Sequence, residues 1–263
     1  MSIQKSWREL KTMHRACTIV VETLEVLAQA AVAGTTTREL DTISRERILK
    51  AGAKPAFLGY RGYPATLCIS VNDEVVHGIP GKRKLQEGDL VSLDLGCIVD
   101  GFYGDAARTV GVGKVSADGQ RLMKATEESL LAGIAECHPS KRIGDIGAAV
   151  QKVAEGYGYS VVREFVGHGI GTSLHEDPQV PNYGPPGRRE RLVPGMCLAI
   201  EPMVNVGRPD VRVLDDGWTA VTLDGSLSAH FELSLAITRH GPWILSEPYP
   251  YGTEQEAEAA AHA

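Results

Sequence analysis

The chain has no hydrophobic run that approaches the roughly 20 apolar residues of a membrane-spanning helix. Its opening, MSIQKSWREL, also lacks the apolar core of a signal peptide. The five cysteines are scattered, odd in number and without CxxC spacing, which argues against a disulfide framework and a structural zinc site. We therefore expect a protein of the reducing cytoplasm that has no membrane partner.

Basic residues are too few to form a basic stripe. Lys and Arg number 27 against 33 Asp and Glu, so the net charge is -6 and nothing favours nucleic-acid binding. A hydrophobic content of 43% is ordinary for a soluble globular protein. The length of 263 residues suits one large domain or two small ones.

Four stretches of the chain have helical patterns. Apolar residues recur every three or four positions over the first thirty-odd residues, and Gly34 ends this stretch. Thr36 followed by Glu39 is a capping-box pattern that starts a second helix, running to about Gly52. Two more helices are predicted near residues 119–137 and 143–156.

Strand character occupies the stretches from Ala65 to Val112 and from Val161 to about Trp243. The order helices, strands, helices, strands predicts an α/β (α+β) fold of two halves that share one sheet. We place this single domain at residues 1–246. The remaining residues, 247–263, are polar and alanine-rich with little core to pack on, so we expect a disordered tail.

Two aspartates lie on a predicted hairpin. Asp100-Gly101 is a strong two-residue turn between two alternating stretches. If this turn sets the register, Asp94 lies opposite Ala107, and Asp105 lies on the same face, diagonal to Asp94. A turn-capping role would account for Asp105 alone, but neither aspartate is at the turn itself.

Two glutamates and a histidine repeat this pattern in the second half. Glu201 ends an alternating stretch, and Glu232 lies opposite the apolar face of the last strand. Either glutamate alone could simply lie on a solvent-exposed face of its strand. That explanation is poor for both glutamates together with the two hairpin aspartates. His168 lies in GHGIG, where glycines let the backbone approach a site closely. A lone histidine is more often structural, but His175 follows seven residues later.

These four carboxylates and one imidazole predict a metal centre. Carboxylates in apolar or glycine-rich stretches need a compensating cation, and four negative charges balance two divalent ions. A water between two such ions loses its proton near neutral pH, which predicts a hydrolase. The carboxylate-rich set favours Mn, Fe or Co over a purely zinc-type site, and HExxH is absent. The choice among Co, Mn, Fe, Zn and Ni stays open.

Five segments match a known family. They resemble bacterial type I methionine aminopeptidases, and the resemblance covers about residues 5 to 245 with all five ligand positions in order. It implies the pita-bread fold, in which two pseudo-symmetric halves with a curved antiparallel sheet and covering helices surround a dinuclear metal site. It also implies removal of the N-terminal methionine from nascent proteins whose second residue is small. The segments are GYRGYPATLCISVNDEVVHGIP, SLDLGCIVDGFYGDAARTV, VVREFVGHGIGTSLHEDPQVPNYG, VPGMCLAIEPMVN and DGWTAVTLDGSLSAHFELSLAIT.

The resemblance implies a role for each metal ligand. Asp94 would chelate one metal, while Asp105 and Glu232 would bridge both. His168 and Glu201 would complete the shell of the other metal. Glu201 would also shuttle the proton of the bridging water.

The resemblance also implies the residues that bind substrate. His77 and His175 would hold the scissile peptide and its tetrahedral intermediate. The methionine pocket would comprise Tyr60, Tyr63, Cys68 and Trp218, for which ordinary core packing is the alternative. Asn72 and Ser228 match positions near a monovalent cation site.

Three positions depart from the family pattern. Leu233 stands where bacterial relatives often have histidine. This departure changes the residues that surround the neighbouring ligand Glu232, but not the ligand itself. Leu174 stands before His175, where an aromatic residue is common, so the pocket wall would be softer. Phe57 replaces a small or sulfur-containing residue.

Two other functions compete with this interpretation. The first is a prolidase or proline-specific aminopeptidase of the same fold, but these enzymes usually carry a large extra N-terminal domain. The second is a non-catalytic pita-bread scaffold or ribosome-associated factor, a class that typically loses ligand residues. The resemblance further implies a monomer that associates transiently with ribosomes and acts on the N-termini of nascent peptides.

Overall fold

The computed structural model describes residues 4–252 and has helices and strands in the predicted order. The helices are α1 (Trp7–Ala30), α2 (Thr37–Lys50), α3 (Ala117–Ala135) and α4 (Ile143–Gly156), with a short 3-10 turn at Tyr60–Gly62. The strands are β1 (Lys54–Pro55), β2 (Leu67–Val71), β3 (Glu74–Val76), β4 (Leu90–Val99), β5 (Phe102–Gly111), β6 (Ser160–Val161), β7 (Gly167–Gly169), β8 (Glu176–Val180), β9 (Cys197–Ile200), β10 (Met203–Asn205), β11 (Val211–Val213), β12 (Ala220–Thr222), β13 (Ser228–His230), β14 (Glu232–Ile237) and β15 (Pro242–Ile244).

The predicted start of α2 is confirmed by its cap. The Thr36 hydroxyl accepts a hydrogen bond from the Glu39 backbone at 3.2 Å, and the Glu39 carboxylate accepts one from the Thr36 backbone at 2.7 Å. This reciprocal pair satisfies two backbone groups that the first turn leaves without intrahelical partners. No helix in residues 4–252 has the length and apolar character that a membrane span requires.

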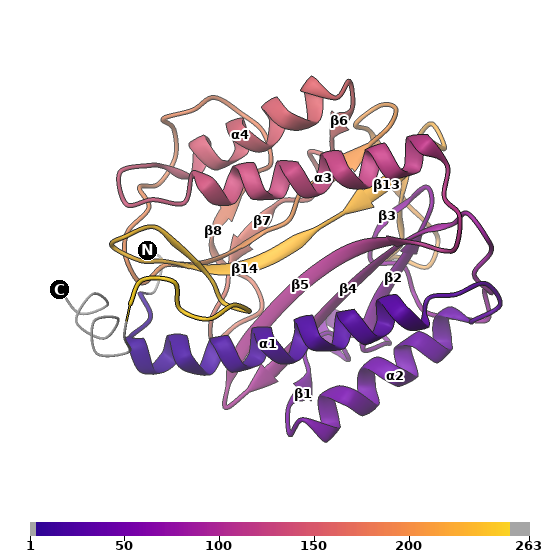
Figure 1. The fold of residues 1–263 in the computed structure, drawn as a ribbon, viewed down its shortest axis with the longest axis horizontal. Coiled ribbons are helices and arrows are strands. Elements are labelled where there is room, and N and C mark those ends of the chain that lie inside the picture. Colours follow the sequence, from indigo (N-terminus) through magenta and orange to yellow (C-terminus); the bar gives the residue numbers. More distant parts are fainter. Residues whose placement is uncertain (1–3, 253–263) are drawn as a thin grey trace.

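A nine-stranded antiparallel sheet joins the two halves within the described chain. Its main path is β1-β4-β5-β14-β9-β7-β8, with β2 paired to β4 and β15 paired to β14. The pairing of β5 with β14 connects the first half of the chain to the second. In Figure 1, α1 runs along β4 and β5, while α3 and α4 lie together beside the other half. This arrangement confirms the predicted α/β architecture of two halves sharing one sheet.

Each half has its own apolar core between helices and sheet. One cluster joins α1 and α2 to β2, β4 and β5 through residues such as Leu24, Leu40 and Leu93. The other joins α3 and α4 to β9 and β14 through residues such as Ile146 and Leu198. Burial of apolar surface on both sides of the β5–β14 junction holds the centre of the sheet in place.

The first residues of the expected tail contact the domain. Tyr249 lies with its ring centroid 5.2 Å from both Trp7 and Trp243, and the Tyr251 hydroxyl donates to the Pro242 carbonyl at 3.0 Å. Residues 247–252 therefore pack against the domain, because their tyrosines supply aromatic surface. The polar and alanine-rich composition of residues 247–263 taken together did not indicate this packing. The rest of the expected tail, residues 253–263, lies outside the described residues.

Candidate metal centre and substrate pocket

The hairpin register places the two aspartates as predicted. Asp94 of β4 pairs with Ala107 of β5, and Asp105 pairs with Gly96 two positions along. Ala107 also pairs with Glu232 of β14 on its other side. Asp94 and Glu232 thus flank Ala107 across three strands, with Asp105 two residues away on the same face. Three carboxylates therefore converge at the strand junction between the two halves.

The second half adds His168 and Glu201 to this group. His168 of β7 pairs with Ala199 of β9, and Glu201 follows the last residue of β9. The His168 Nε2 atom lies 3.5 Å from Glu201 Oε1. One ligand atom from each of Asp105, His168 and Glu232 lies within 4.8 Å of the others. The structure thus gathers the five predicted ligands from four separate strands and a strand end.

The carboxylates are buried without enough partners. Asp94 Oδ1, Asp105 Oδ1 and Glu232 Oε1 accept no hydrogen bond from the described residues. Burial raises the pKa of Asp94 to about 7. The pKa of Asp105 is raised by burial and by the nearby charges of Glu232 and Asp94. Burial, together with neighbouring carboxylates, likewise raises the pKa of Glu232 and Glu201.

His168 is prepared to act as a neutral ligand. Burial lowers its pKa to about 3, so the ring is uncharged at neutral pH. Its Nδ1 lies 2.9 Å from the Gly169 carbonyl, and donation of the Nδ1 proton there leaves the Nε2 lone pair free to bind a cation. An uncharged imidazole beside unsatisfied buried carboxylates fits divalent metal ions, whose charge would offset the repulsion among the carboxylates.

The metal ligands share one cavity with the predicted substrate residues. The cavity has a volume of about 360 Å³. All eleven predicted site residues line it: Tyr60, Tyr63, Cys68, His77, Asp94, Asp105, His168, His175, Glu201, Trp218 and Glu232.

One wall of the cavity is aromatic and apolar. Tyr63 and Trp218 meet edge to face with ring centroids 5.1 Å apart. The Tyr63 hydroxyl donates to the carbonyls of Leu67 and Gly78 at 3.1 and 2.8 Å, which fixes the ring. Cys68 is buried beside them, and burial raises its pKa well above the usual value, so the thiol is uncharged and acts as apolar wall. These side chains form a slot for an apolar group.

The two predicted substrate histidines line the same cavity as this slot. The His175 ring lies 4.3 Å from that of His168, centroid to centroid. The His77 ring meets Phe165 edge to face at 5.3 Å, and its backbone has a left-handed φ of 62°. Burial lowers the pKa of His77 to about 4 and also lowers that of His175. Both rings are therefore neutral near pH 7, and each has one N–H group to donate.

The three departures from the family pattern have distinct positions. Leu174 and Phe57 are buried in the pocket wall, in the same apolar cluster as Tyr63 and Cys68. Leu233 instead contacts both main core clusters. Leucine in place of histidine at this position therefore changes the packing of the two core clusters and leaves the face of β14 that carries Glu232 unchanged.

Asn72 and Ser228 also come together. The Ser228 backbone donates to the Asn72 carbonyl at 2.9 Å. The Asn72 side chain donates to Asp89 and accepts from the Leu90 backbone, both at 2.9 Å. A monovalent cation near these residues stays a prediction.

Sequence reasoning missed His230. This side chain is 1% exposed, and neither ring nitrogen has a hydrogen-bond partner in the described residues. Its Nε2 atom lies 3.8 Å from Glu201 Oε2. The available signal was its spacing of two residues from Glu232, which places both side chains on one side of an extended chain.

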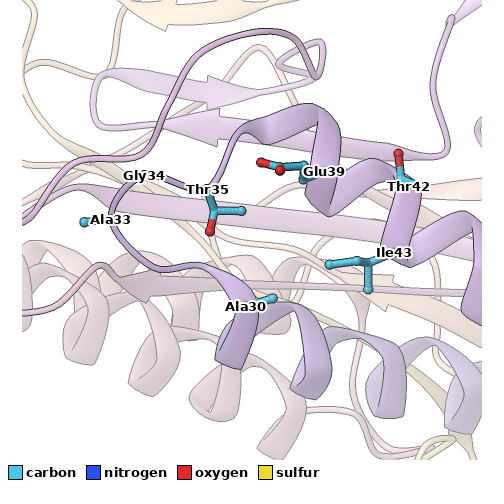
Figure 2. Close-up of a pocket in the computed structure, with 7 residues that line it drawn as sticks. All are labelled: Ala30, Ala33, Gly34, Thr35, Glu39, Thr42 and Ile43. Atoms are coloured by element: carbon cyan, nitrogen blue, oxygen red, sulfur yellow. The ribbon is translucent and has the colours of Figure 1, made fainter.

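A second hollow lies elsewhere, where α1 ends and α2 begins (Figure 2). Its charged side chain, Glu39, already caps α2 through Thr36. This hollow therefore offers no group of metal ligands. The residues that line it are Ala30, Ala33, Gly34, Thr35, Glu39, Thr42 and Ile43.

Comparison with known proteins assigns the fold and site to one class. Residues 11–239 match the description "Metallopeptidase family M24". The chain belongs to metallopeptidase family M24. It therefore shares the pita-bread fold and the use of divalent metal that define this family of metallopeptidases.

Several proteins that are about half identical to this chain are methionine aminopeptidases. One from Clostridium perfringens is 52% identical over 246 residues, which cover 94% of this chain and 99% of the relative. Methionine aminopeptidase 1 of Bacillus subtilis is 50% identical over 246 residues, with the same coverage of both chains. The crystal structure of the Thermotoga maritima methionine aminopeptidase, 45% identical, has a TM-score of 0.93 and covers 94% of this chain and 100% of its own.

Prolidases share the fold at a greater distance. The prolidase of Pyrococcus horikoshii is 23% identical, with a TM-score of 0.76, and the match spans 95% of this chain but 65% of the prolidase. This likeness shows the common fold alone. The remaining third of that prolidase has no counterpart in the match.

Proposed function

We propose that this chain is a methionine aminopeptidase, a hydrolase that removes N-terminal methionine from proteins whose second residue is small. The observation that carries the proposal is one cavity that joins five metal-binding side chains to an apolar slot. The names of relatives at 50 and 52% identity support the same substrate. The prolidase alternative is supported by fold likeness alone.

The metal centre would hold two divalent ions. Asp94, Asp105, His168, Glu201 and Glu232 supply four carboxylates and one neutral imidazole, and four negative charges match two M²⁺ ions. When bound, such ions lower the pKa of a water molecule and stabilise negative charge on a substrate oxygen. The carboxylate-rich donors favour Mn, Fe or Co, with Zn and Ni as further candidates.

Glu201 is the residue that would move protons. Its carboxylate is at the end of β9, reaches the cavity, and has a pKa that burial and the charges of Asp94 and Asp105 raise. A carboxylate of raised pKa is a better proton acceptor, and it can return the proton to the departing amine.

His77 and His175 would act on the peptide. Both line the cavity with neutral rings, so each can donate one hydrogen bond to the carbonyl oxygen of the scissile bond. Donors aimed at the developing oxyanion stabilise the transition state more than the ground state. The slot formed by Tyr60, Tyr63, Cys68 and Trp218 would hold the methionine side chain and set which residue is removed.

Substrate comparison tests this proposal. Purified protein loaded with Mn²⁺, Fe²⁺ or Co²⁺ is assayed on Met-Ala-Ser, on a Pro-initiated peptide and on Ala-Pro peptides, alongside metal analysis. We expect hydrolysis of Met-Ala-Ser only, and loss of activity after chelation. Turnover of Ala-Pro without Met-Ala-Ser would establish the prolidase alternative. A protein that binds no metal and hydrolyses none of these peptides would establish the scaffold.

The cellular setting follows from the same proposal. The substrates would be N-termini of nascent peptides in the cytoplasm, reached by a monomer through transient association with the ribosome. Sedimentation of the protein with translating ribosomes, and its mass in solution, test these two points.

A further inference from the structure

A buried ion pair connects the start of the chain to the substrate pocket. Lys5 precedes α1, and its ammonium group binds the carboxylate of Glu176, 171 residues away. The two side chains are only 3% and 9% exposed. Charges at such depth are costly to bury unless they are paired and hydrogen-bonded, so this contact differs from an ordinary surface pair.

Glu176 immediately follows His175 and organises the turn that carries it. Its Oε1 atom accepts hydrogen bonds from the backbone N–H groups of Thr172 and Ser173, at 2.8 and 3.2 Å. Its other oxygen, Oε2, binds Lys5. One carboxylate therefore ties the two ends of the turn together, and the His175 ring extends from this turn into the cavity.

Lys5 is itself held firmly in place. Its backbone N–H donates to the Gly195 carbonyl at 2.8 Å. A Cβ at Gly171 would lie 2.3 Å from Lys5 Cε and 2.5 Å from Glu176 Oε1. The turn therefore approaches the ion pair so closely that only glycine fits at position 171 without displacing it. The ion pair and the turn form one packed unit.

We propose that Lys5 is a positioning residue for His175. Its ammonium neutralises the buried Glu176 carboxylate, and Glu176 can then hold the turn that places the His175 ring beside His168 and Tyr60. The inference rests on the proposed function, in which His175 donates to the scissile carbonyl. The alternative is that the pair merely anchors the N-terminal segment and affects stability alone.

The two roles differ in what removal of Lys5 does. Loss of one partner leaves an unpaired buried charge, whereas loss of both charges leaves none unpaired, and an amide oxygen at position 176 can still accept from the backbone of the turn. A displacement of about 1 Å in a positioned group can reduce a rate by about 10²-fold. A positioning role therefore predicts a loss of kcat on removal of Lys5 alone, with recovery when Glu176 is neutralised as well.

The experiment compares Lys5→Met, Glu176→Gln and the double variant on Met-Ala-Ser at saturating metal. We expect the Lys5→Met kcat to fall by about 10-fold to 10²-fold, with KM within about twofold of wild type and unchanged metal content. Glu176→Gln should also lower kcat, because its amide NH₂ faces the Lys5 ammonium. The double variant should recover most of kcat, since the glutamine oxygen still accepts from Thr172 and Ser173.

The matched control is Arg15→Met, which removes an exposed ion pair with Asp100 and should leave kcat unchanged. A lower melting temperature with unchanged kcat in Lys5→Met would show that the ion pair between Lys5 and Glu176 only stabilises the fold. That result would overturn the proposal. If Lys5→Met does not fold, wild-type kcat in Glu176→Gln overturns it equally. Failure of the wild-type chain to hydrolyse Met-Ala-Ser would instead contradict the proposed function itself.

Discussion

The hydroxyl of Tyr60 lies 2.7 Å from Nδ1 of His175. This contact joins the 3-10 turn of the first half to the loop before β8 in the second half. If the hydroxyl donates to Nδ1, the ring proton is on Nε2, the nitrogen that remains free to donate to a peptide carbonyl. Donation in this direction would make the contact between the two halves favour the form of His175 that the proposed reaction needs.

Replacement of Tyr60 tests that contact. Tyr60→Phe should lower kcat about fivefold, because loss of one hydrogen bond worth about 1 kcal/mol weakens the preference for the donating form. The measurement is steady-state hydrolysis of Met-Ala-Ser. Tyr251→Phe, which removes a hydroxyl far from the cavity, is the control and should match wild type. Equal kcat in both variants would mean that the Tyr60 hydroxyl does not orient His175.

Removal of the His175 ring should have a larger effect. We expect His175→Ala to lose on the order of 10²-fold or more in kcat, since it removes a donor to the oxyanion, while KM changes little. Elemental analysis should show normal metal content. A variant that loses its metal would identify His175 as a ligand and require a different site.

Glu201→Gln should keep the fold but lose most activity. The amide cannot accept a proton from the attacking water and supplies no negative charge to a cation. Thermal unfolding checks the fold, and peptide hydrolysis at saturating metal checks the activity. Full turnover in this variant would be incompatible with Glu201 as the proton acceptor.

Trp218→Ala should weaken the selectivity for methionine as the first residue of the substrate. An apolar pocket discriminates by about 1–3 kcal/mol per methylene-sized change, so an enlarged slot should narrow the ratio of kcat/KM for Met over Leu substrates. Leu49→Ala, an exposed position on α2, serves as the control. An unchanged ratio in Trp218→Ala would remove the tryptophan from the specificity pocket.

Metal removal should make stability depend on pH in a specific direction. The pKa of Asp94 rises from 3.8 to about 7 in the folded chain without metal, and those of Asp105, Glu201 and Glu232 also rise. The folded state then binds more protons than the unfolded state, so the free energy of unfolding falls as pH rises from about 4 to 7.

Thermal unfolding of chelated protein measures this dependence. We expect the melting temperature of the chelated protein to fall over that pH interval, and added divalent metal to flatten the decline, because binding releases the protons. Asp94→Asn should reduce the slope. A melting temperature that rises with pH in the chelated protein would show that the carboxylates are not raised in pKa.

Local rules determined a large part of this protein from its sequence. The Asp100-Gly101 turn alone established that Asp94 lies opposite Ala107, because a two-residue hairpin leaves one register. The Thr36 and Glu39 capping box set the start of α2 in the same way. Resemblance of whole segments added six substrate residues to the five metal ligands that the patterns had indicated, and all eleven line the cavity.

Only the tertiary structure decided which distant segments meet. The β5–β14 pairing that sets Glu232 beside Ala107, the ion pair between Lys5 and Glu176, and the approach of His230 to Glu201 each join parts of the chain that no turn connects. Such contacts depend on packing the whole core, where the burial of one surface selects the partner of another. Hydrophobic periodicity and turn motifs depend only on residues that are close in sequence. These long-range contacts therefore could not be predicted from them.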